Sequence, residues 1–215
     1  MAKRLLIIGS GGHAKEVAQI ARRIDPERSI WNPISYVANS RTEIRQTRPY
    51  GTIDYVDDDV LSGIATGDAV IGLGDSQARY RVASRLVGLP NLSFLNLIDP
   101  SVAIDQEFVV LGKGNVIHRQ VVLTCDIVIG DFNVFNKGSI VAHDAHIGSF
   151  NDVHPTASLH GYSQLGDGCI VGAGARVLPN VSVADRTTIG AGAILLHSIS
   201  EPGHVYAGVP AKRLR

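Results

Sequence analysis

Large apolar residues recur at every sixth position through the second half of the chain. Fifteen consecutive matches run without a break: Leu111, Ile117, Leu123, Ile129, Phe135, Val141, Ile147, Val153, Leu159, Leu165, Val171, Val177, Val183, Ile189 and Leu195. An α-helix would repeat its apolar face about every 3.6 residues, and a simple strand about every 2. A strict six-residue period therefore predicts a solenoid, in which each repeat forms one side of a coil.

The other positions of each hexad are also patterned, and they predict how the coil turns. The second position often holds glycine or asparagine, and the fifth is small or β-branched, as at Ser139, Ala157 and Cys169. We expect the large residue to fill the middle of a triangular prism, and the small one to lie near a corner where the glycine turns the backbone. Three hexads make one coil, so the run of fifteen forms five coils. An irregular start near Ile98 and Ile104 adds about one more.

Residues 1–95 follow a different pattern, in which short apolar strands alternate with amphipathic helices. The pattern predicts strands at residues 4–8, 34–37 and 68–73, helices at 14–24 and 76–86, and loops with one weak strand at 39–59. This alternation is typical of a small α/β domain with a parallel sheet. We therefore expect a Rossmann-like α/β domain at residues 1–95, followed by a parallel β-helix domain with a C-terminal tail at residues 96–215.

Composition and charge narrow the possible partners. The 215 residues are 45% hydrophobic, and 20 Lys and Arg balance 20 Asp and Glu. The balanced charge gives no net positive potential that would attract nucleic acid or an anionic membrane. No apolar stretch is long enough to span a bilayer. Because the chain also starts without a secretory signal, we expect a cytoplasmic protein. Cys169, on an inward position, is then expected to be a packed thiol.

A glycine-rich turn follows the first predicted strand. The spacing of Gly9, Gly11 and Ala14 fits a fingerprint for a turn that leads into a helix, whose N-terminus can hold phosphates. The motif alone is weak, because such turns also serve packing. No acidic residue suited to a ribose 2′-hydroxyl follows the second strand, which disfavours a redox dinucleotide.

Three further segments give the chain a resemblance to a known family. They are residues 7–13 (IIGSGGH), 142–148 (AHDAHIG) and 207–212 (AGVPAK). In order and separation they resemble bacterial sugar acetyltransferases of the sialic-acid O-acetyltransferase and bacillosamine N-acetyltransferase type, which are hexapeptide-repeat enzymes. The resemblance implies a left-handed parallel β-helix, a homotrimer and acetyl-CoA as cosubstrate. The left hand comes from the resemblance alone, since right-handed crossovers are the general rule.

The resemblance also implies a catalytic pair. His143 matches the family's general base, and Asp144 beside it would orient the ring and stabilise the imidazolium. An imidazole can accept the proton that a sugar amine loses while attacking a thioester carbonyl. We therefore expect direct transfer without an acyl-enzyme.

The cofactor and acceptor sites are implied in the same way. Gly161 should lie one coil beyond His143, where its backbone can hold the thioester oxygen as negative charge develops. Ala173 and Ala191, which are likewise three hexads apart, match positions that line the acetyl-CoA groove. Asn136 matches an asparagine near the sugar amine.

In the N-terminal domain, the resemblance suggests a nucleotide-sugar site. Gly11, Gly12 and His13 would hold the diphosphate or base, and Gly74 and Asp75 match a second contact. Both loops follow the carboxyl ends of predicted parallel strands, where ligands bind in such sheets.

Two positions depart from the family pattern. Asp152, assigned here to the cofactor site, stands where many members have a second histidine near the acetyl group. Residues 37–39 (VAN) replace an acidic pair that contacts the nucleotide, so uridine is not implied.

The leading hypothesis is an acetyl-CoA-dependent N-acetyltransferase that acts on the amino group of a nucleotide-linked deoxysugar for polysaccharide or glycan synthesis. An O-acetyltransferase on sialic acid or a related sugar is an alternative, because amine and hydroxyl acceptors need the same base. A zinc enzyme of the carbonic-anhydrase-like β-helix type is a third, although the eight histidines form no convincing ligand trio in the sequence, and no metal is expected.

Overall fold

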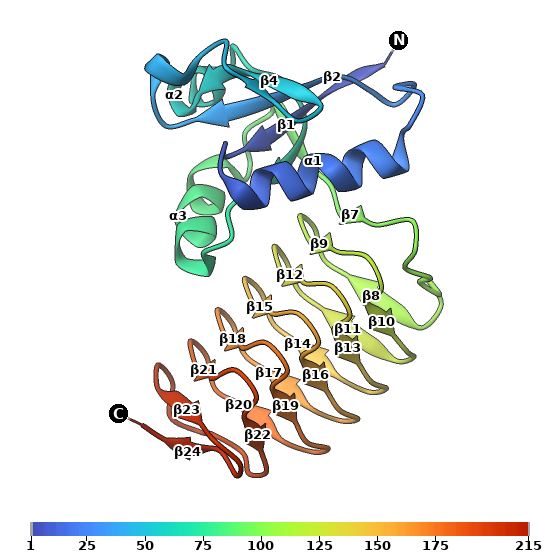
Figure 1. Cartoon of the computed structure of the whole chain (residues 1–215), viewed down its shortest axis with the longest axis vertical. Coiled ribbons are helices and arrows are strands. Elements are labelled where there is room, and N and C mark those ends of the chain that lie inside the picture. The colour runs from blue at the N-terminus through green and yellow to red at the C-terminus, as the bar shows by residue number, and fades with distance from the viewer. Residues whose placement is uncertain (1, 215) are drawn as a thin grey trace. The chain divides into compact units, whose positions relative to one another are not determined.

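The computed structural model describes residues 2–214. The chain divides into two compact units between Pro100 and Ser101. Figure 1 colours the first unit, an α/β unit, from blue to green, and the second, a parallel β-helix, from green to red.

The α/β unit is built on a mostly parallel sheet. Its strands are β1 (Lys3–Ile8), β2 (Trp31–Ala38), β3 (Thr47–Arg48), β4 (Gly51–Val56), β5 (Gly67–Ile71) and β6 (Leu92–Phe94). The short strand β7 (Leu97–Ile98) follows in the chain and is not part of this sheet. The strand order is β3-β4-β2-β1-β5-β6. The β3–β4 pair is antiparallel, and the other pairs are parallel. Leu5, Leu6 and Ile7 of the central strand β1 are fully buried, so the sheet is covered on both faces.

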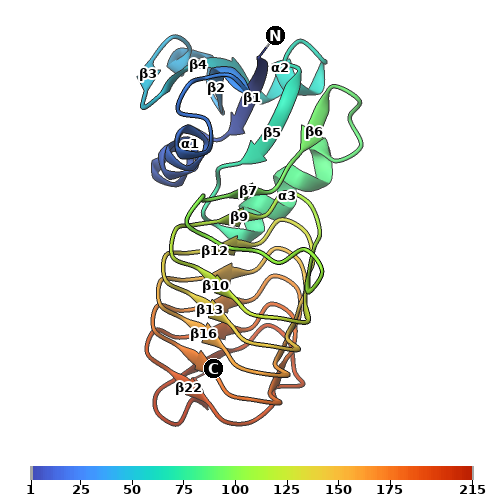
Figure 2. The same cartoon turned by 90° about the vertical axis from the view of Figure 1, so that its right-hand side faces the viewer.

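Right-handed crossovers explain where the helices lie. The helices are α1 (Gly12–Ile24), the 3₁₀ turn η1 (Arg41–Glu43), α2 (Asp57–Leu61) and α3 (Ser76–Leu86). The chain steps from β1 to β2 in one direction across the sheet, and from β4 to β5 and β5 to β6 in the other. Right-handed connections therefore place α1 on one face and α2 and α3 on the opposite face, as Figure 2 shows.

The predicted elements of this unit are present, but residues 39–59 hold more structure than expected. Instead of loops with one weak strand, they contain η1, β3, the six-residue strand β4 and the start of α2. Strand β4 was not predicted at this length because it contains polar residues such as Asp54. In the sheet, the Asp54 carboxylate accepts a hydrogen bond from the Ser35 hydroxyl of β2. Ile53 and Val56 supply the buried side of β4. The short strand β6 was not predicted.

The β-helix unit has three faces, each made of strands that stack one coil apart. The β14 face contains β8 (Val109–Leu111), β11 (Ile127–Ile129), β14 (His146–Ile147), β17 (Gln164–Leu165) and β20 (Ser182–Val183). The β15 face contains β9 (Val116–Ile117), β12 (Val134–Phe135), β15 (Asp152–Val153), β18 (Ile170–Val171), β21 (Thr188–Ile189), β23 (Val205–Ala207) and β24 (Lys212–Arg213). The β13 face contains β10 (Val122–Leu123), β13 (Ile140–Val141), β16 (Ser158–Leu159), β19 (Arg176–Val177) and β22 (Ile194–Leu195).

The hexad pattern predicted this interior. Val141 pairs with Leu123 on one side and Leu159 on the other, which is the expected register of three hexads per coil. All large hexad residues are buried except Leu111, which is half-buried in the first strand of the unit. Ser139, Ala157 and Cys169 at the fifth position are buried as well.

The predicted turn position was wrong. Left-handed backbone falls on the fourth residue of the hexad, as at Asp126, Asp144 and Asn180, rather than on the second. The second-position glycines are needed for close stacking instead. A Cβ on Gly148 would lie 2.9 Å from the backbone of Gly166 in the next coil, a distance that side chains do not tolerate.

Buried amides bridge successive coils near one edge of the interior. The Asn115 side-chain oxygen accepts a hydrogen bond from the Asn133 backbone N–H at 2.8 Å, and Asn133 does the same for Asn151 at 2.8 Å. Cys169 continues the column, and its backbone N–H donates to Asn151 at 2.7 Å. Burial raises the pKa of the Cys169 thiol to about 11, so this thiol remains protonated and packed.

The last coil ends in a reversal of chain direction. Strand β23 pairs in parallel with β21, and β24 then pairs antiparallel with β23. The Arg213 guanidinium donates to Glu201 at 2.7 Å across this segment. Over residues 2–214, none of the helices combines the length and apolar character that a bilayer crossing requires.

Candidate active site

The predicted catalytic pair lies on a corner of the β-helix, where the β13 face turns into the β14 face. We call this the His143 corner; it comprises residues 125–126, 143–144, 161–162 and 179–180 of successive coils. Asp144 has a left-handed backbone, with φ of 58°, which short polar side chains tolerate well. This backbone turn brings the Asp144 carboxylate against the ring of the residue before it.

The His143 imidazole and the Asp144 carboxylate form a hydrogen bond. The Nδ1–Oδ2 distance is 2.8 Å, and the side chains are 53% and 35% exposed, respectively. A carboxylate can only accept, so Nδ1 carries the proton in this contact. The Nε2 lone pair is then free to accept a proton from a substrate, which is the arrangement that a general base needs.

Gly161 lies directly against the imidazole. A Cβ on Gly161 would be 2.7 Å from Cε1 and 2.8 Å from Nε2 of His143. The spacing of three hexads predicted this neighbourhood, and a larger residue at position 161 would have to displace the ring. The backbone of Gly161 therefore borders the atom that would take the proton.

Tyr162 is a third residue in contact with the His143 imidazole, beside Asp144 and Gly161, and the sequence analysis did not single it out. Its ring meets the His143 ring edge to face, with centroids 5.4 Å apart and planes at 87°. The signal that could have found it is its spacing, three hexads after Asp144 on the same corner.

Three other predicted residues lie on a different corner, where the β15 face turns into the β13 face. Ala173 and Ala191 are both exposed. They stack one coil apart, with the Gly192 N–H donating to the Ala173 carbonyl at 2.8 Å. Asn136 is half-buried at the start of the same corner. We call this the Ala173 corner. Within one chain, the coil does not bring it together with His143.

Asp152 lies on neither corner. It is in strand β15, where it pairs with Val134 and Ile170 of the adjacent coils and is only 3% exposed. Its role at the cofactor site, in place of a family histidine, remains a prediction.

The predicted nucleotide-sugar residues gather at the carboxyl ends of β1 and β5, which are neighbours in the sheet. A Cβ on Gly74 would lie 3.7 Å from the His13 Cβ, so the two loops touch. Gly11 and Gly12 are exposed, and no described atom comes within 4 Å of a Cβ added at either. Asp75 caps α3 by accepting the Ala78 N–H at 2.7 Å. The arrangement leaves the N-terminal backbone of α1 open to a phosphate.

A charged group beside this turn was not predicted. The Ser10 hydroxyl donates to Glu43 at 3.1 Å, and the Arg48 Nε donates to the Ser10 carbonyl at 3.3 Å. The Arg48 guanidinium and the Glu43 carboxylate are 3.7 Å apart. They lie on β3 and η1, in the segment that was expected to form loops, so their approach to the glycine turn could not be foreseen.

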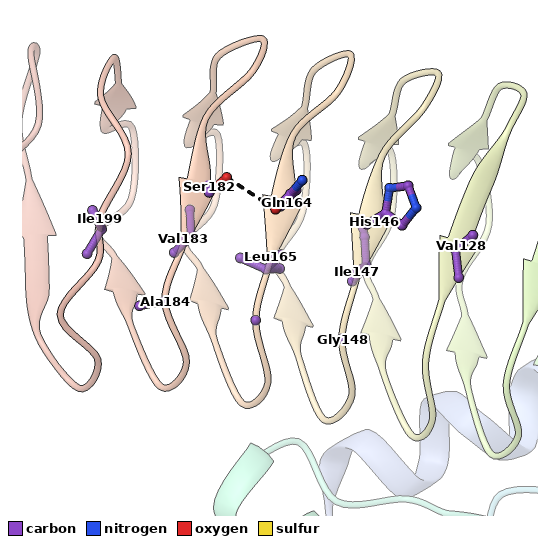
Figure 3. A pocket seen from close by; sticks show the side chains of 11 residues that line it. Val128, His146, Ile147, Gly148, Gln164, Leu165, Ser182, Val183, Ala184 and Ile199 are labelled. Carbon is purple, nitrogen blue, oxygen red and sulfur yellow. Dashed lines mark hydrogen bonds between the residues drawn. The ribbon is translucent and has the colours of Figure 1, made fainter.

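A groove of about 450 Å³ runs along the β14 face. Figure 3 shows its outward side chains, among which His146, Gln164 and Ser182 belong to successive coils. The Ser182 hydroxyl donates to the Gln164 side-chain oxygen at 3.3 Å. The groove contains none of the predicted site residues.

Comparisons with known proteins agree with this architecture. Residues 4–86 match the PglD N-terminal domain, and residues 162–197 match the bacterial transferase hexapeptide (six repeats). A comparison with curated proteins finds no match.

Among solved structures, the acetyltransferase domain of PglB from Neisseria gonorrhoeae has a TM-score of 0.88 and 26% identity, covering 98% of this chain and 99% of that one. PerB from Caulobacter crescentus, in complex with CoA and GDP-perosamine, has a TM-score of 0.86 and 26% identity, covering 98% and 96%. WeeI from Acinetobacter baumannii has a TM-score of 0.84 and 25% identity, covering 98% and 99%.

These matches confirm the resemblance seen in the sequence, including the left-handed β-helix. The chain is therefore similar along its length to hexapeptide-repeat acetyltransferases, with a PglD-type N-terminal domain at residues 4–86 and hexapeptide repeats at residues 162–197.

Proposed function

We propose that this acyltransferase moves the acetyl group of acetyl-CoA to the amino group of a nucleotide-linked deoxysugar. The observation that carries the proposal is the His143–Asp144 pair, with a 2.8 Å hydrogen bond on one side and Gly161 against the ring. The likeness to PerB, whose structure holds CoA and GDP-perosamine, supports the substrate class.

The geometry suggests how the reaction proceeds. The Nε2 atom of His143 accepts the proton that the amine loses as its nitrogen bonds to the thioester carbonyl carbon. Asp144 stabilises the imidazolium that forms. His143 then returns the proton to the departing sulfur as the carbon–sulfur bond breaks. His143 alone can therefore both accept and return the transferred proton.

Gly161 has a separate role in this scheme. Its N–H donates to no backbone acceptor among residues 2–214, so it is available to the thioester oxygen. A backbone donor held in place before reaction stabilises the negative charge that develops on that oxygen.

We further propose that the enzyme is a homotrimer with its site shared between copies. His143 and the Ala173 corner lie apart on one prism, and a cyclic trimer can bring one copy's His143 corner to the next copy's Ala173 corner. Two defective variants test this. His143→Ala and Ala173→Trp should each be inactive alone, and co-assembly of the two should restore part of the activity. No recovery in confirmed mixed trimers would contradict a shared site.

For the nucleotide, we propose that Gly11, Gly12 and His13 hold the diphosphate, with Gly74 and Asp75 beside them. Arg48 adds a guanidinium next to the turn, held by the Ser10 carbonyl. Guanidinium groups bind phosphate oxygens through paired hydrogen bonds.

The test of the proposed function is thiol release from acetyl-CoA in the presence of a panel of nucleotide-linked sugars. Amino sugars should release thiol, and their matched hydroxyl analogues should not. His143→Ala should reduce release to a small residual rate while the thermal melting curve is unchanged. Release only with hydroxyl sugars would favour O-acetylation, and release by His143→Ala at the wild-type rate would remove His143 from the mechanism.

A further inference from the structure

Tyr162 is a conspicuous residue on the His143 corner. The residues at its position in the neighbouring coils are Asp126, Asp144 and Asn180, all short and polar. These types adopt left-handed backbone readily, whereas a bulky aromatic residue in that conformation is uncommon. Tyr162 nevertheless has φ of 60°. Phe132 and Phe150 have φ of 56° and 61° at the same hexad position of another corner, where their rings stack on each other at 5.3 Å, so the aromatic residues at this position make ring contacts between coils.

The Tyr162 ring faces the imidazole rather than the interior of the prism. It is 54% exposed, so burial of apolar surface does not account for it. Its ring meets His143 edge to face at 5.4 Å, and its backbone N–H donates to the His143 carbonyl at 3.0 Å. The backbone bond recurs in the neighbouring coils at Asp144 and Asn180, so the ring contact is what distinguishes Tyr162.

The imidazole needs such support because it is open to solvent. The Asp144 hydrogen bond fixes Nδ1, and Gly161 limits movement toward the next coil. More than half of the His143 side chain is exposed, so neither contact prevents the ring from swinging outward about its Cα–Cβ bond. An aromatic ring placed edge to face restricts that rotation.

We infer that Tyr162 is a positioning residue, which holds the His143 imidazole so that Nδ1 stays on Asp144 and Nε2 faces the acceptor. The inference rests on the proposed function of His143. It assigns the effect to the aromatic ring and not to the hydroxyl.

Two substitutions at Tyr162 separate the effect of the ring from that of the hydroxyl, and a third substitution elsewhere serves as the control. Tyr162→Phe keeps the ring and should retain the wild-type kcat. Tyr162→Asn removes the ring but suits the left-handed backbone, so it should be at least as stable as the wild type. An edge-to-face pair is worth roughly a 2- to 12-fold change in rate, and kcat of Tyr162→Asn should fall by that factor with little change in KM. Tyr80→Ala removes a similarly exposed tyrosine (57%) from α3 and should change neither.

A second measurement does not depend on activity. In NMR spectra, the Hε1 resonance of His143, identified by its loss in His143→Ala, should shift in Tyr162→Asn and stay in place in Tyr162→Phe. Wild-type kcat in Tyr162→Asn, or equal loss in both variants, would overturn the inference. Absence of acetyl transfer by the wild type would instead count against the proposed function.

Discussion

The contact between Gly161 and the His143 imidazole leads to a quantitative prediction for Gly161→Ala. The new Cβ would lie 2.7 Å from Cε1, whereas ordinary contacts begin at 3.4 Å, so the ring must move by about 0.7 Å (3.4 − 2.7). The Gly161 backbone is not left-handed, so alanine is allowed there. Because the ring is half exposed and can move, the stability cost should stay within about 0.5 kcal/mol.

The cost to catalysis should be much larger. Misplacement of a reacting group by about 1 Å can lower a rate by about 100-fold. For a shift of about 0.7 Å, we expect kcat/KM to fall between about tenfold and 100-fold, or about 1.4 to 2.7 kcal/mol of transition-state stabilisation. The assay is thiol release from acetyl-CoA, with thermal melting as the measure of folding.

A double-mutant cycle isolates the cause. In a His143→Ala background there is no ring to displace, so Gly161→Ala should have no further effect on the residual rate. Retention of the wild-type rate by the single variant would refute the reasoning, as would an equal loss in both backgrounds.

Three other predictions concern the rest of the chain. Burial alone would raise the pKa of Asp25, but hydrogen bonds from three backbone N–H groups and a serine hydroxyl outweigh it and lower the pKa. The ionised Asp25 carboxylate therefore stabilises the fold fully above about pH 4, and this stabilisation is lost as pH falls through the lowered pKa. Asp25→Asn should lower the free energy of unfolding by about 1–3 kcal/mol in urea at neutral pH and should weaken the fall of stability with decreasing pH. An unchanged fall of stability at acid pH would contradict this. Cys169 is buried and Cys125 exposed, so a disulfide reagent should titrate one thiol in the native protein and two after unfolding, and two fast thiols would show that the interior is open. Arg48→Ala should weaken nucleoside diphosphate binding by about tenfold in calorimetry, and an unchanged Kd would remove Arg48 from the site.

The sequence predicted the β-helix well because its period depends on burial, which repeats in every coil. The same period indicated that Gly161 would lie beside His143. It did not reveal the position of left-handed backbone, because the second-position glycines are required for coil contacts rather than for the turn. Aspartate and asparagine at the fourth position were the better signal.

Other parts of the site depend on three-dimensional contacts that no local pattern records. Glu43 and Arg48 reach the glycine turn through η1 and β3, within a segment whose polar residues predict loops. In the sequence, nothing distinguishes Tyr162 from an ordinary exposed tyrosine. Only the stacking of coils shows that it lies next to the His143 imidazole. Which corner of a neighbouring copy completes the site is likewise a property of assembly, not of the local sequence.

The antiparallel strand β24 has a consequence for the behaviour of the molecule in concentrated solution. A stack of parallel coils would leave a ladder of unsatisfied N–H and C=O groups on its final rung, and a second molecule could extend it indefinitely. The reversal of chain direction at β23 and β24 covers one side of the last coil. Because β24 runs antiparallel to β23, it does not offer the parallel pairing that a further coil would need. Removal of this terminal hairpin should therefore expose the rung and favour pairing of one molecule with another.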